Sequence, residues 1–348
     1  MSLKHQLKLL LRETYARLLF HSGAHRLVDR LQPRRLLVLA GHCVSAPSNE
    51  ILVKDMRIRA ADLERILAWL ARRYEVTSVG RGVRRLAEPG RQSLVALSMD
   101  DGYRDNRTAL LPLLQKLGLT ATIYLESAPL DERRLNWTHK FFWTLDRLGT
   151  ERFVEHYLSR ARDERSRALL GAQRTSYQLK RVLKYEAPAE ERTRLVDELF
   201  REAGGDERAL CERLYMDWED VRALDRAGVE LGAHTVHHEI LSRLDAEGAR
   251  REIEGSKRAL ERGLGHAVSS FAYPFGRRWD YHAAAVEAAR AAGFESATTT
   301  HAGTSRADSP RFELKRVMID EEARLHLIAA EACGGFDLLR RFGIELGE

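Results

Sequence analysis

The stretch Ser93-Leu94-Val95-Ala96-Leu97-Ser98-Met99-Asp100-Asp101-Gly102 decides the fold of this chain. An uncharged run is followed at once by two carboxylates and a glycine, which is typical of a strand buried on both faces that ends in a polar turn. Strands buried on both faces belong to parallel sheets, because helices cover each side of such a sheet. The stretch therefore predicts a parallel α/β fold with charge at the end of one strand.

The sequence on both sides of this strand alternates between strand and helix patterns. Further buried strands are predicted at 35–40, 120–125, 229–233, 268–273 and 296–300. Helices are predicted at 62–74, 106–117, 246–263 and 281–292. This alternation favours parallel βαβ units. We predict an α/β fold, a distorted and incomplete (β/α) barrel; spacing alone leaves an open doubly wound sheet as the alternative.

One long segment, about 138–228, interrupts the alternation. It is rich in Arg, Glu and Leu, has a helical pattern throughout and contains a single proline, Pro188. We interpret it as a helical insertion carried between two strands. The predicted organisation is an N-terminal amphipathic helical segment over 1–32 and a barrel domain over 33–348 that contains the insertion.

The composition excludes several classes of protein. The chain has 348 residues, of which 44% are hydrophobic and 31% charged, so it is neither disordered nor fibrous. Its longest apolar run, 36–40, is too short for a membrane span. The net charge of +6 comes from dispersed arginines, and we expect no nucleic-acid partner. Three cysteines without metal-like spacing predict neither a disulfide framework nor a cysteine metal site.

Residues 1–29 have the leucine spacing of an amphipathic basic helix. One interpretation is a helix packed on the domain, and the other is peripheral contact with an anionic membrane surface. The segment lacks the unbroken apolar stretch and the small-residue cleavage site of a secretion signal. We therefore expect a cytoplasmic protein, with peripheral contact at the inner face of the membrane as the second expectation.

Polar clusters follow four of the predicted strands, at 41–42, 100–101, 234–238 and 271–276. Each cluster has a purely structural explanation when taken alone. It could cap a helix, supply a histidine whose hydrogen bonds are made within the fold, or form a packed turn after a strand. In a parallel barrel, however, the strand ends that carry the functional side chains converge on one rim. One Asp and two His leave a coordination position open for water, which is the arrangement of a catalytic metal site.

The histidine cluster His234-Thr235-Val236-His237-His238 offers two chelating pairs. His234 could act with His238 at i,i+4 or with His237 at i,i+3, and spacing does not decide between them. A second carboxylate beside the ligand could act as a base on water. The residue types alone predict a metal-assisted hydrolase.

Three motifs in this order, 98–103 (SMDDGY), 234–238 (HTVHH) and 271–276 (FAYPFG), resemble the polysaccharide deacetylase family. That family includes the nodulation-type chitooligosaccharide deacetylases and adopts a distorted (β/α) barrel. The resemblance implies that Asp100 is the general base and that Asp101, His234 and His238 bind the metal. It also implies that the backbone amide at Phe275 helps to hold the oxyanion.

The chain departs from the family pattern at two places. Family members carry an arginine in the third motif that braces the base, and here that position is Ala272; Arg316 is the candidate replacement. No clear copy of the family's late Leu-x-His motif follows Gly276, since His326 falls in an expected terminal helix. Some members are permuted, with this histidine near the N-terminus, and 39–44 (LAGHCV) resembles their segment. We therefore assign the leaving-group acid to His42.

The resemblance implies a metal-dependent N-deacetylase of the carbon–nitrogen hydrolases that acts on an N-acetylated sugar in a polysaccharide or glycan precursor. Zn²⁺ is the first candidate metal, and Co²⁺, Ni²⁺ and Mn²⁺ are alternatives. Two other functions remain open. One is an amidohydrolase for a lipid-linked sugar or a small non-sugar amide. The other is an inactive carbohydrate-binding module, which the missing arginine suggests and the retained Asp and His residues oppose.

Overall fold

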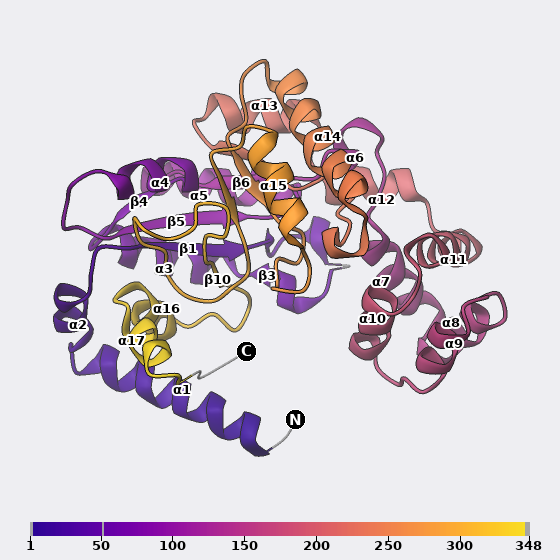
Figure 1. Cartoon of the computed structure of the whole chain (residues 1–348), viewed down its shortest axis with the longest axis horizontal. Helices are drawn as coiled ribbons and strands as arrows, with labels where there is room; N and C mark the ends of the chain where they lie inside the picture. The colour runs from indigo at the N-terminus through magenta and orange to yellow at the C-terminus, as the bar shows by residue number, and fades with distance from the viewer. Residues whose placement is uncertain (1–2, 51, 345–348) are drawn as a thin grey trace.

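The computed structural model describes residues 3–50 and 52–344, and its centre is one curled parallel sheet (Figure 1). The strand order is β10-β1-β5-β6-β7-β8-β9, and β4 pairs with the first half of β5. The strands are β1 (Leu36–Gly41), β4 (Glu75–Thr77), β5 (Leu94–Met99), β6 (Thr122–Leu125), β7 (Glu230–Ala233), β8 (Ser270–Ala272), β9 (Ser296–Thr298) and β10 (Val317–Met318). The fold is an incomplete (β/α) barrel, as the sequence predicts.

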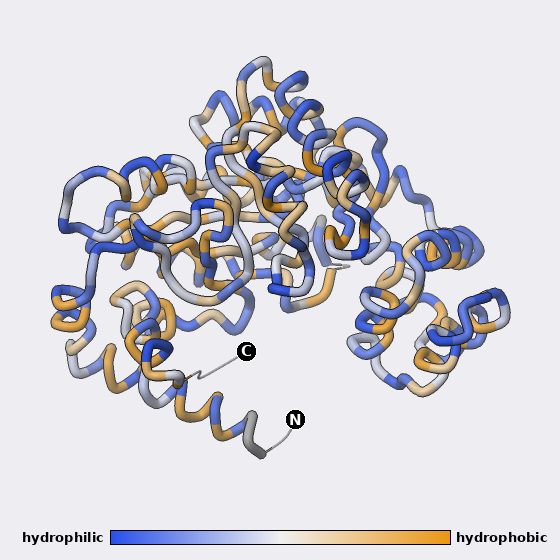
Figure 2. The backbone as a smooth tube through the Cα atoms, in the orientation of Figure 1, coloured by the Kyte–Doolittle hydropathy of each residue, from blue (hydrophilic) through white to orange (hydrophobic). Residues whose placement is uncertain are grey.

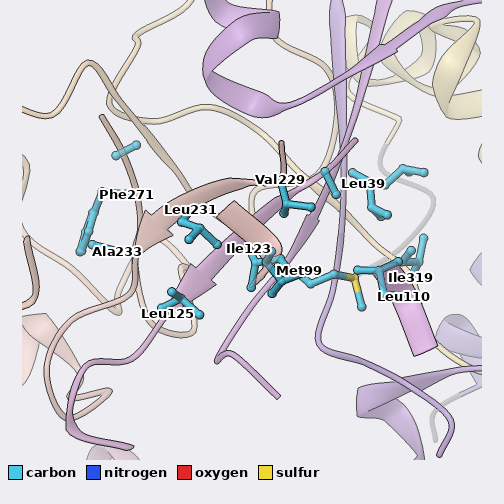
Figure 3. Close-up of a cluster of buried hydrophobic side chains, with 14 of the residues drawn as sticks. Leu39, Met99, Leu110, Ile123, Leu125, Val229, Leu231, Ala233, Phe271 and Ile319 are labelled. Atoms are coloured by element: carbon cyan, nitrogen blue, oxygen red, sulfur yellow. The ribbon is translucent and has the colours of Figure 1, made fainter. Parts of the chain in front are cut away.

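Helices cover the outside of this sheet, and side chains from both layers form the main core (Figure 3). The covering helices are α3 (Ala60–Ala71), α4 (Val79–Ala87), α5 (Leu111–Leu117), α6 (Ala128–Asp131), α14 (Ala246–Leu264) and α15 (Ala283–Ala291). Met99 and Ile123 are fully buried beside Leu231 and Phe271 in this core. Because the strands are buried on both faces, the polar residues at their carboxyl ends are the first groups that can meet solvent.

The structure differs from the predicted strands and helices in α4, which the sequence pattern does not predict, and in several short elements. The two-residue strands β2 (Cys43–Val44) and β3 (Arg57–Ile58) form a separate pair, and β10 is equally short. A strand of two or three residues has no periodicity that a pattern could reveal. The predicted helix over 106–117 begins with a π turn, Asn106–Leu110.

In the described chain, eight helices lie between β6 and β7, and the seven that follow α6 form the segment in which the sequence predicts an insertion. These seven are α7 (Trp137–Leu148), α8 (Thr150–Leu158), α9 (Glu164–Gly171), α10 (Ser176–Tyr185), α11 (Ala189–Glu202), α12 (Glu207–Leu214) and α13 (Trp218–Arg226). Helices α7 to α11 form a lobe at the right of Figure 1. The lobe has its own apolar core, in which Phe141, Phe153 and Leu195 are fully buried. This core lets the lobe hold its shape while it rests against the barrel.

The N-terminal segment forms two helices, α1 (Leu3–His21) and α2 (His25–Leu31), where the sequence predicts one. The break falls at Gly23, whose φ of 78° ends the first helix. Ala16 and Leu19 of α1 pack on α16 (Leu325–Ala332) and α17 (Gly335–Arg341). Leucines on its other face remain exposed, so apolar and polar residues alternate along α1 (Figure 2). Within the described residues, no helix combines the length and apolar character that crossing a bilayer requires.

Candidate active site

Asp101, His234 and His238 meet at the carboxyl ends of β5 and β7. Each offers one ligand atom, and the three atoms lie within 4.8 Å of one another. The Oδ1 atom of Asp101 is 3.4 Å from Nε2 of His234 and 3.5 Å from Nε2 of His238. All three side chains are buried. Of the two histidine pairs that spacing leaves open, the structure brings His234 and His238 together.

The donor set fits a divalent metal ion. Oδ1 of Asp101 is buried without a hydrogen-bond partner, which is costly for a carboxylate oxygen unless a cation occupies the space beside it. Nδ1 of His234 lies 2.7 Å from the carbonyl oxygen of Ala272, and this contact leaves Nε2 available as the ligand atom. Burial lowers the pKa of His238 to about 3, so its imidazole is neutral, as metal binding requires.

Unusual backbone conformations concentrate at this site. Five non-glycine residues in the described part of the chain have positive φ, and four of them are Asp101 (71°), Thr235 (65°), His238 (55°) and Phe275 (61°). Such conformations are unfavourable for residues with a Cβ and persist where the surrounding structure enforces them. The hydroxyl of Thr235 holds its turn by accepting the N–H of His238 at 3.0 Å and donating to the carbonyl of His234 at 2.6 Å. The surrounding structure thus enforces an unusual backbone at the strand ends that carry Asp101 and His238.

Asp100 forms a buried, two-pronged ion pair with Arg316, which precedes β10. The guanidinium donates to the two carboxylate oxygens over 2.7 Å and 2.8 Å. Its Nε donates to the carbonyl of Thr299 over 2.7 Å. Burial raises the pKa of Asp100, but Arg316 together with the nearby His234 and His42 outweighs this effect, and the net shift is downward. Arg316 therefore makes with Asp100 the contact expected of a bracing arginine, although it comes from a different segment than Ala272.

His42 and Phe275 complete the rim around the metal ligands. His42 lies between β1 and β2, is half-buried and lines the active-site cavity. Its carbonyl accepts a hydrogen bond from the side-chain amide of Asn106 at 3.1 Å. The ring of Phe275 lies 4.7 Å from that of His238. Gly276 holds the turn after Phe275, since a Cβ at this position would lie 2.8 Å from the backbone nitrogen of Thr300.

Two other histidines lie outside the site. His237 is exposed, and its Nδ1 contacts Glu252 at 2.7 Å. His326 lies in α16, where its Nε2 contacts Glu13 of α1 at 2.8 Å. His326 is therefore part of the contact between α1 and α16, and it belongs neither to the Asp101–His234–His238 cluster nor to the cavity lining.

A buried polar network beside the site was not predicted from the sequence, and the insertion contributes His139 to it. This network links His139 to the hydroxyl of Tyr103 at 2.7 Å and to Asn136 at 2.8 Å, and Asn136 in turn contacts Glu126 at 2.9 Å. Burial raises the pKa of Glu126 well above its usual range. The sequence Trp137-Thr138-His139-Lys140 at the start of a helix does not indicate that His139 takes part in such a network.

The cavity above these residues has a volume of about 940 Å³. Asp100, Asp101, His234 and His238 contribute to its lining, and α10 of the insertion forms another part of the wall. A volume of this size accommodates a ligand larger than a single sugar ring.

Comparison with protein families and curated proteins finds similarity over part of the chain. The polysaccharide deacetylase profile matches residues 172–297, which include both metal-site histidines but not the Asp pair. The Bacillus subtilis (strain 168) protein YxkH, named as a polysaccharide deacetylase, is 22% identical over 112 residues. That match covers 32% of this chain and only 39% of YxkH.

Solved structures share the fold at low identity. The deacetylase PplD of Streptococcus pyogenes, solved with acetate, has a TM-score of 0.55 and 16% identity over 86% of this chain and 99% of its own. The polysaccharide deacetylase BC0361 of Bacillus cereus has a TM-score of 0.55 and 17% identity, with 86% of this chain and 69% of its own covered. IcaB of Ammonifex degensii has a TM-score of 0.54 and 17% identity over 87% of this chain and 98% of its own.

Proposed function

We propose that this chain is a member of the polysaccharide deacetylase family and acts as a metal-dependent N-deacetylase, a proposal that the partial profile match and the shared fold support. Its substrate is an N-acetylated sugar in a polysaccharide or a glycan precursor, and its role lies in the synthesis of exopolysaccharide or cell-surface glycan. The observation that carries the proposal is the convergence of Asp101, His234 and His238 beside the Asp100–Arg316 pair at one cavity.

We assign the metal to Asp101, His234 and His238, with Zn²⁺ as the first candidate and Co²⁺, Ni²⁺ and Mn²⁺ as alternatives. When bound, such an ion supplies Lewis-acid polarisation and lowers the pKa of water. A metal held by only three protein ligands would keep a coordination position open for exchangeable oxygen ligands.

The other residues divide the proton transfers and the charge between them. Asp100, held in orientation by Arg316, accepts a proton from the attacking water. The N–H of Phe275 donates to the oxyanion of the tetrahedral intermediate. His42 donates a proton to the departing amine, and acetate and the free amino sugar are released.

Acetate release from monomeric, oligomeric and lipid-linked N-acetyl sugars, and from a small non-sugar N-acetyl amide, tests this function. Release from at least one sugar, abolished by chelation and restored by added Zn²⁺, is the expected result. Release only from a small non-sugar amide would show that the substrate is such an amide and not a sugar. Sugar binding without acetate release from any of these compounds would favour the inactive module.

We expect His42→Ala to slow amide hydrolysis much more than ester hydrolysis. An acid aimed at the leaving group matters most when that group is a poor one, so general-acid loss costs about 10²–10⁴-fold on an N-acetyl sugar. Activated acetate esters need little protonation and should react at nearly the wild-type rate. The measurement is kcat/KM on both substrate types, with metal content and Tm as controls. Equal losses on amide and ester would contradict the assignment.

We also propose that α1 and α2 place the protein on an anionic membrane surface at the cytoplasmic face. Their outward residues are leucines: Leu10 is 62% exposed, Leu18 67% and Leu31 73%. Arg17, Arg26 and Arg30 are exposed on the same two helices. Apolar side chains flanked by arginines match the chemistry of a headgroup layer that contains acidic lipids. The free, buried thiols of Cys43, Cys211 and Cys333 are compatible with a reducing compartment.

Leu7, Leu11 and Leu18 are exposed leucines at helical spacing on α1. Replacing all three by Gln should weaken binding to vesicles that contain phosphatidylglycerol by about tenfold or more, because these side chains would no longer bury apolar surface in the membrane. Co-sedimentation measures the binding, and Tm reports whether α1 still packs through Ala16 and Leu19. Zwitterionic vesicles are the control for charge. Unchanged binding of the triple variant, or equal wild-type binding to both kinds of vesicle, would refute the proposal.

A further inference from the structure

Helix α10 of the insertion has two faces with different roles. Leu179, Val182 and Leu183 are buried in the core of the insertion lobe. The remaining face lines the active-site cavity with residues at helical spacing, namely Ser176, Tyr177, Lys180, Arg181, Lys184 and Tyr185. The insertion therefore contributes a wall to the cavity above the metal ligands, and that wall is rich in cations.

Within this wall, the charge of Lys184 is balanced by an ion pair with Asp280. Its ammonium lies 3.0 Å from Oδ1 of Asp280 and 3.5 Å from the centre of the Phe275 ring. Tyr185 donates to the same Asp280 oxygen over 2.9 Å and accepts a hydrogen bond from the indole N–H of Trp279 over 3.0 Å. These contacts join α10 to the loop between β8 and α15, which fixes the position of the wall over the site.

Lys180, one turn earlier, has no such partner. Among the described residues no carboxylate lies within ion-pair distance of its ammonium, which sits 5.1 Å from the Phe142 ring centre. Burial lowers the pKa of Lys180, and the charges of Asp55 and Asp101 only partly oppose that effect. Two lysines at i,i+4 on one helix face also repel each other. Lys180 thus lacks a counter-charge inside a half-enclosed cavity.

Two arginines of the same cavity are also without an ion pair in the described structure. Arg181 follows Lys180 on α10, and Arg277 comes from the loop after β8. Carboxylates line the cavity as well: Asp55 and Asp320 come from other segments, while Glu186 is held by Arg165 at 2.6 Å. The cations without partners are therefore grouped on α10 and the adjoining loop, beside the exposed ring of Trp279.

We propose that Lys180, with Arg181 and Arg277, binds a phosphate group of the substrate. The substrate class is then an N-acetyl sugar that carries a phosphate or diphosphate ester. Three cations around one cavity suit a phosphate, which carries more charge and more acceptor oxygens than a carboxylate. The exposed faces of Tyr177 and Trp279 offer apolar surface for a sugar ring. This inference rests on the proposed function and specifies its substrate.

The test compares Lys180→Gln with wild type on four substrates: a neutral N-acetylglucosamine oligomer, N-acetylglucosamine 1-phosphate, a nucleoside diphosphate N-acetylglucosamine and a short-chain polyprenyl diphosphate N-acetylglucosamine. For the phosphorylated compounds we expect KM to rise about 10- to 100-fold with little change in kcat, since a charge-assisted contact is lost from bound substrate and transition state alike. The neutral oligomer should change less than about threefold. Lys180→Arg should retain most of the affinity. The difference between the nucleoside and polyprenyl compounds identifies the source of the phosphate.

A matched control is Arg167→Gln, which removes one exposed cation from α9, outside the cavity lining, and should leave all four substrates unaffected. A second readout is calorimetric binding of N-acetylglucosamine 1-phosphate to Asp100→Asn, with and without Lys180→Gln. Loss of this binding with Lys180→Gln supports the inference even if no sugar releases acetate, in which case the proposed function alone fails. Equal effects on neutral and phosphorylated compounds, or hydrolysis of the oligomer alone, would overturn the inference and leave the deacetylase in place.

Discussion

Asp100→Asn is expected to bind its metal and to lose about 10²–10⁴-fold in kcat on an N-acetylated sugar. The amide keeps the shape of the side chain and one acceptor for Arg316, but it cannot take a proton from water at neutral pH. The three atoms that could bind the metal belong to Asp101, His234 and His238. Metal content should therefore stay at the wild-type level in this variant while its activity falls. Elemental analysis of the purified variant, together with acetate release, measures both quantities.

The contrasting variants are Asp101→Ala, His234→Ala and His238→Ala, each of which should lose most of its metal. His237→Ala is the matched control, since its imidazole contacts Glu252 and lies outside the three-residue site. If His237→Ala loses its metal while His238→Ala keeps it, the second histidine ligand is His237 and not His238. Wild-type turnover by Asp100→Asn would remove this residue from the role of general base.

The fold and the position of the site could be predicted because they depend on local patterns. A strand buried on both faces is an uncharged run, and the residues that end it are polar, as in Met99-Asp100-Asp101. Parallel strands bring such ends together, and the structure places Asp101 beside His234 although 132 residues of chain separate them, from 102 to 233. The choice between His237 and His238 required the backbone, since both spacings allow chelation on a regular helix while the real segment turns through positive φ at Thr235 and His238.

The cationic wall could not be predicted from the sequence. The pattern of α10 is that of an ordinary amphipathic helix, whose lysines and arginines would normally face solvent. Only the packing of the insertion against the loop after β8 turns Lys180 and Lys184 toward the active-site cavity. Non-local packing of this kind leaves no trace in the spacing of residues along one helix.

Arg316→Met should destabilise the fold by about 3–5 kcal/mol, because it leaves the carboxylate of Asp100 buried without its cation. The guanidinium is almost fully buried and holds Asp100 through two hydrogen bonds and Thr299 through a third. Urea unfolding of metal-loaded protein, followed by circular dichroism, measures the change in the free energy of unfolding.

The double variant Asp100→Asn/Arg316→Met separates loss of the ion pair from loss of packing. If the two charges stabilise each other, removing both should cost less than the sum of the single losses, with a coupling of about 1–3 kcal/mol. The contact of Arg316 with Thr299 is lost in either background and therefore cancels in the cycle. Strictly additive losses of unfolding free energy would show that Arg316 stabilises the fold through packing alone. Arg316 would then not be the residue that replaces, at Asp100, the arginine absent at Ala272. Coupling with a parallel fall in kcat for Arg316→Met would instead tie the orientation of Asp100, and through it the proton transfer, to an arginine supplied by the segment before β10.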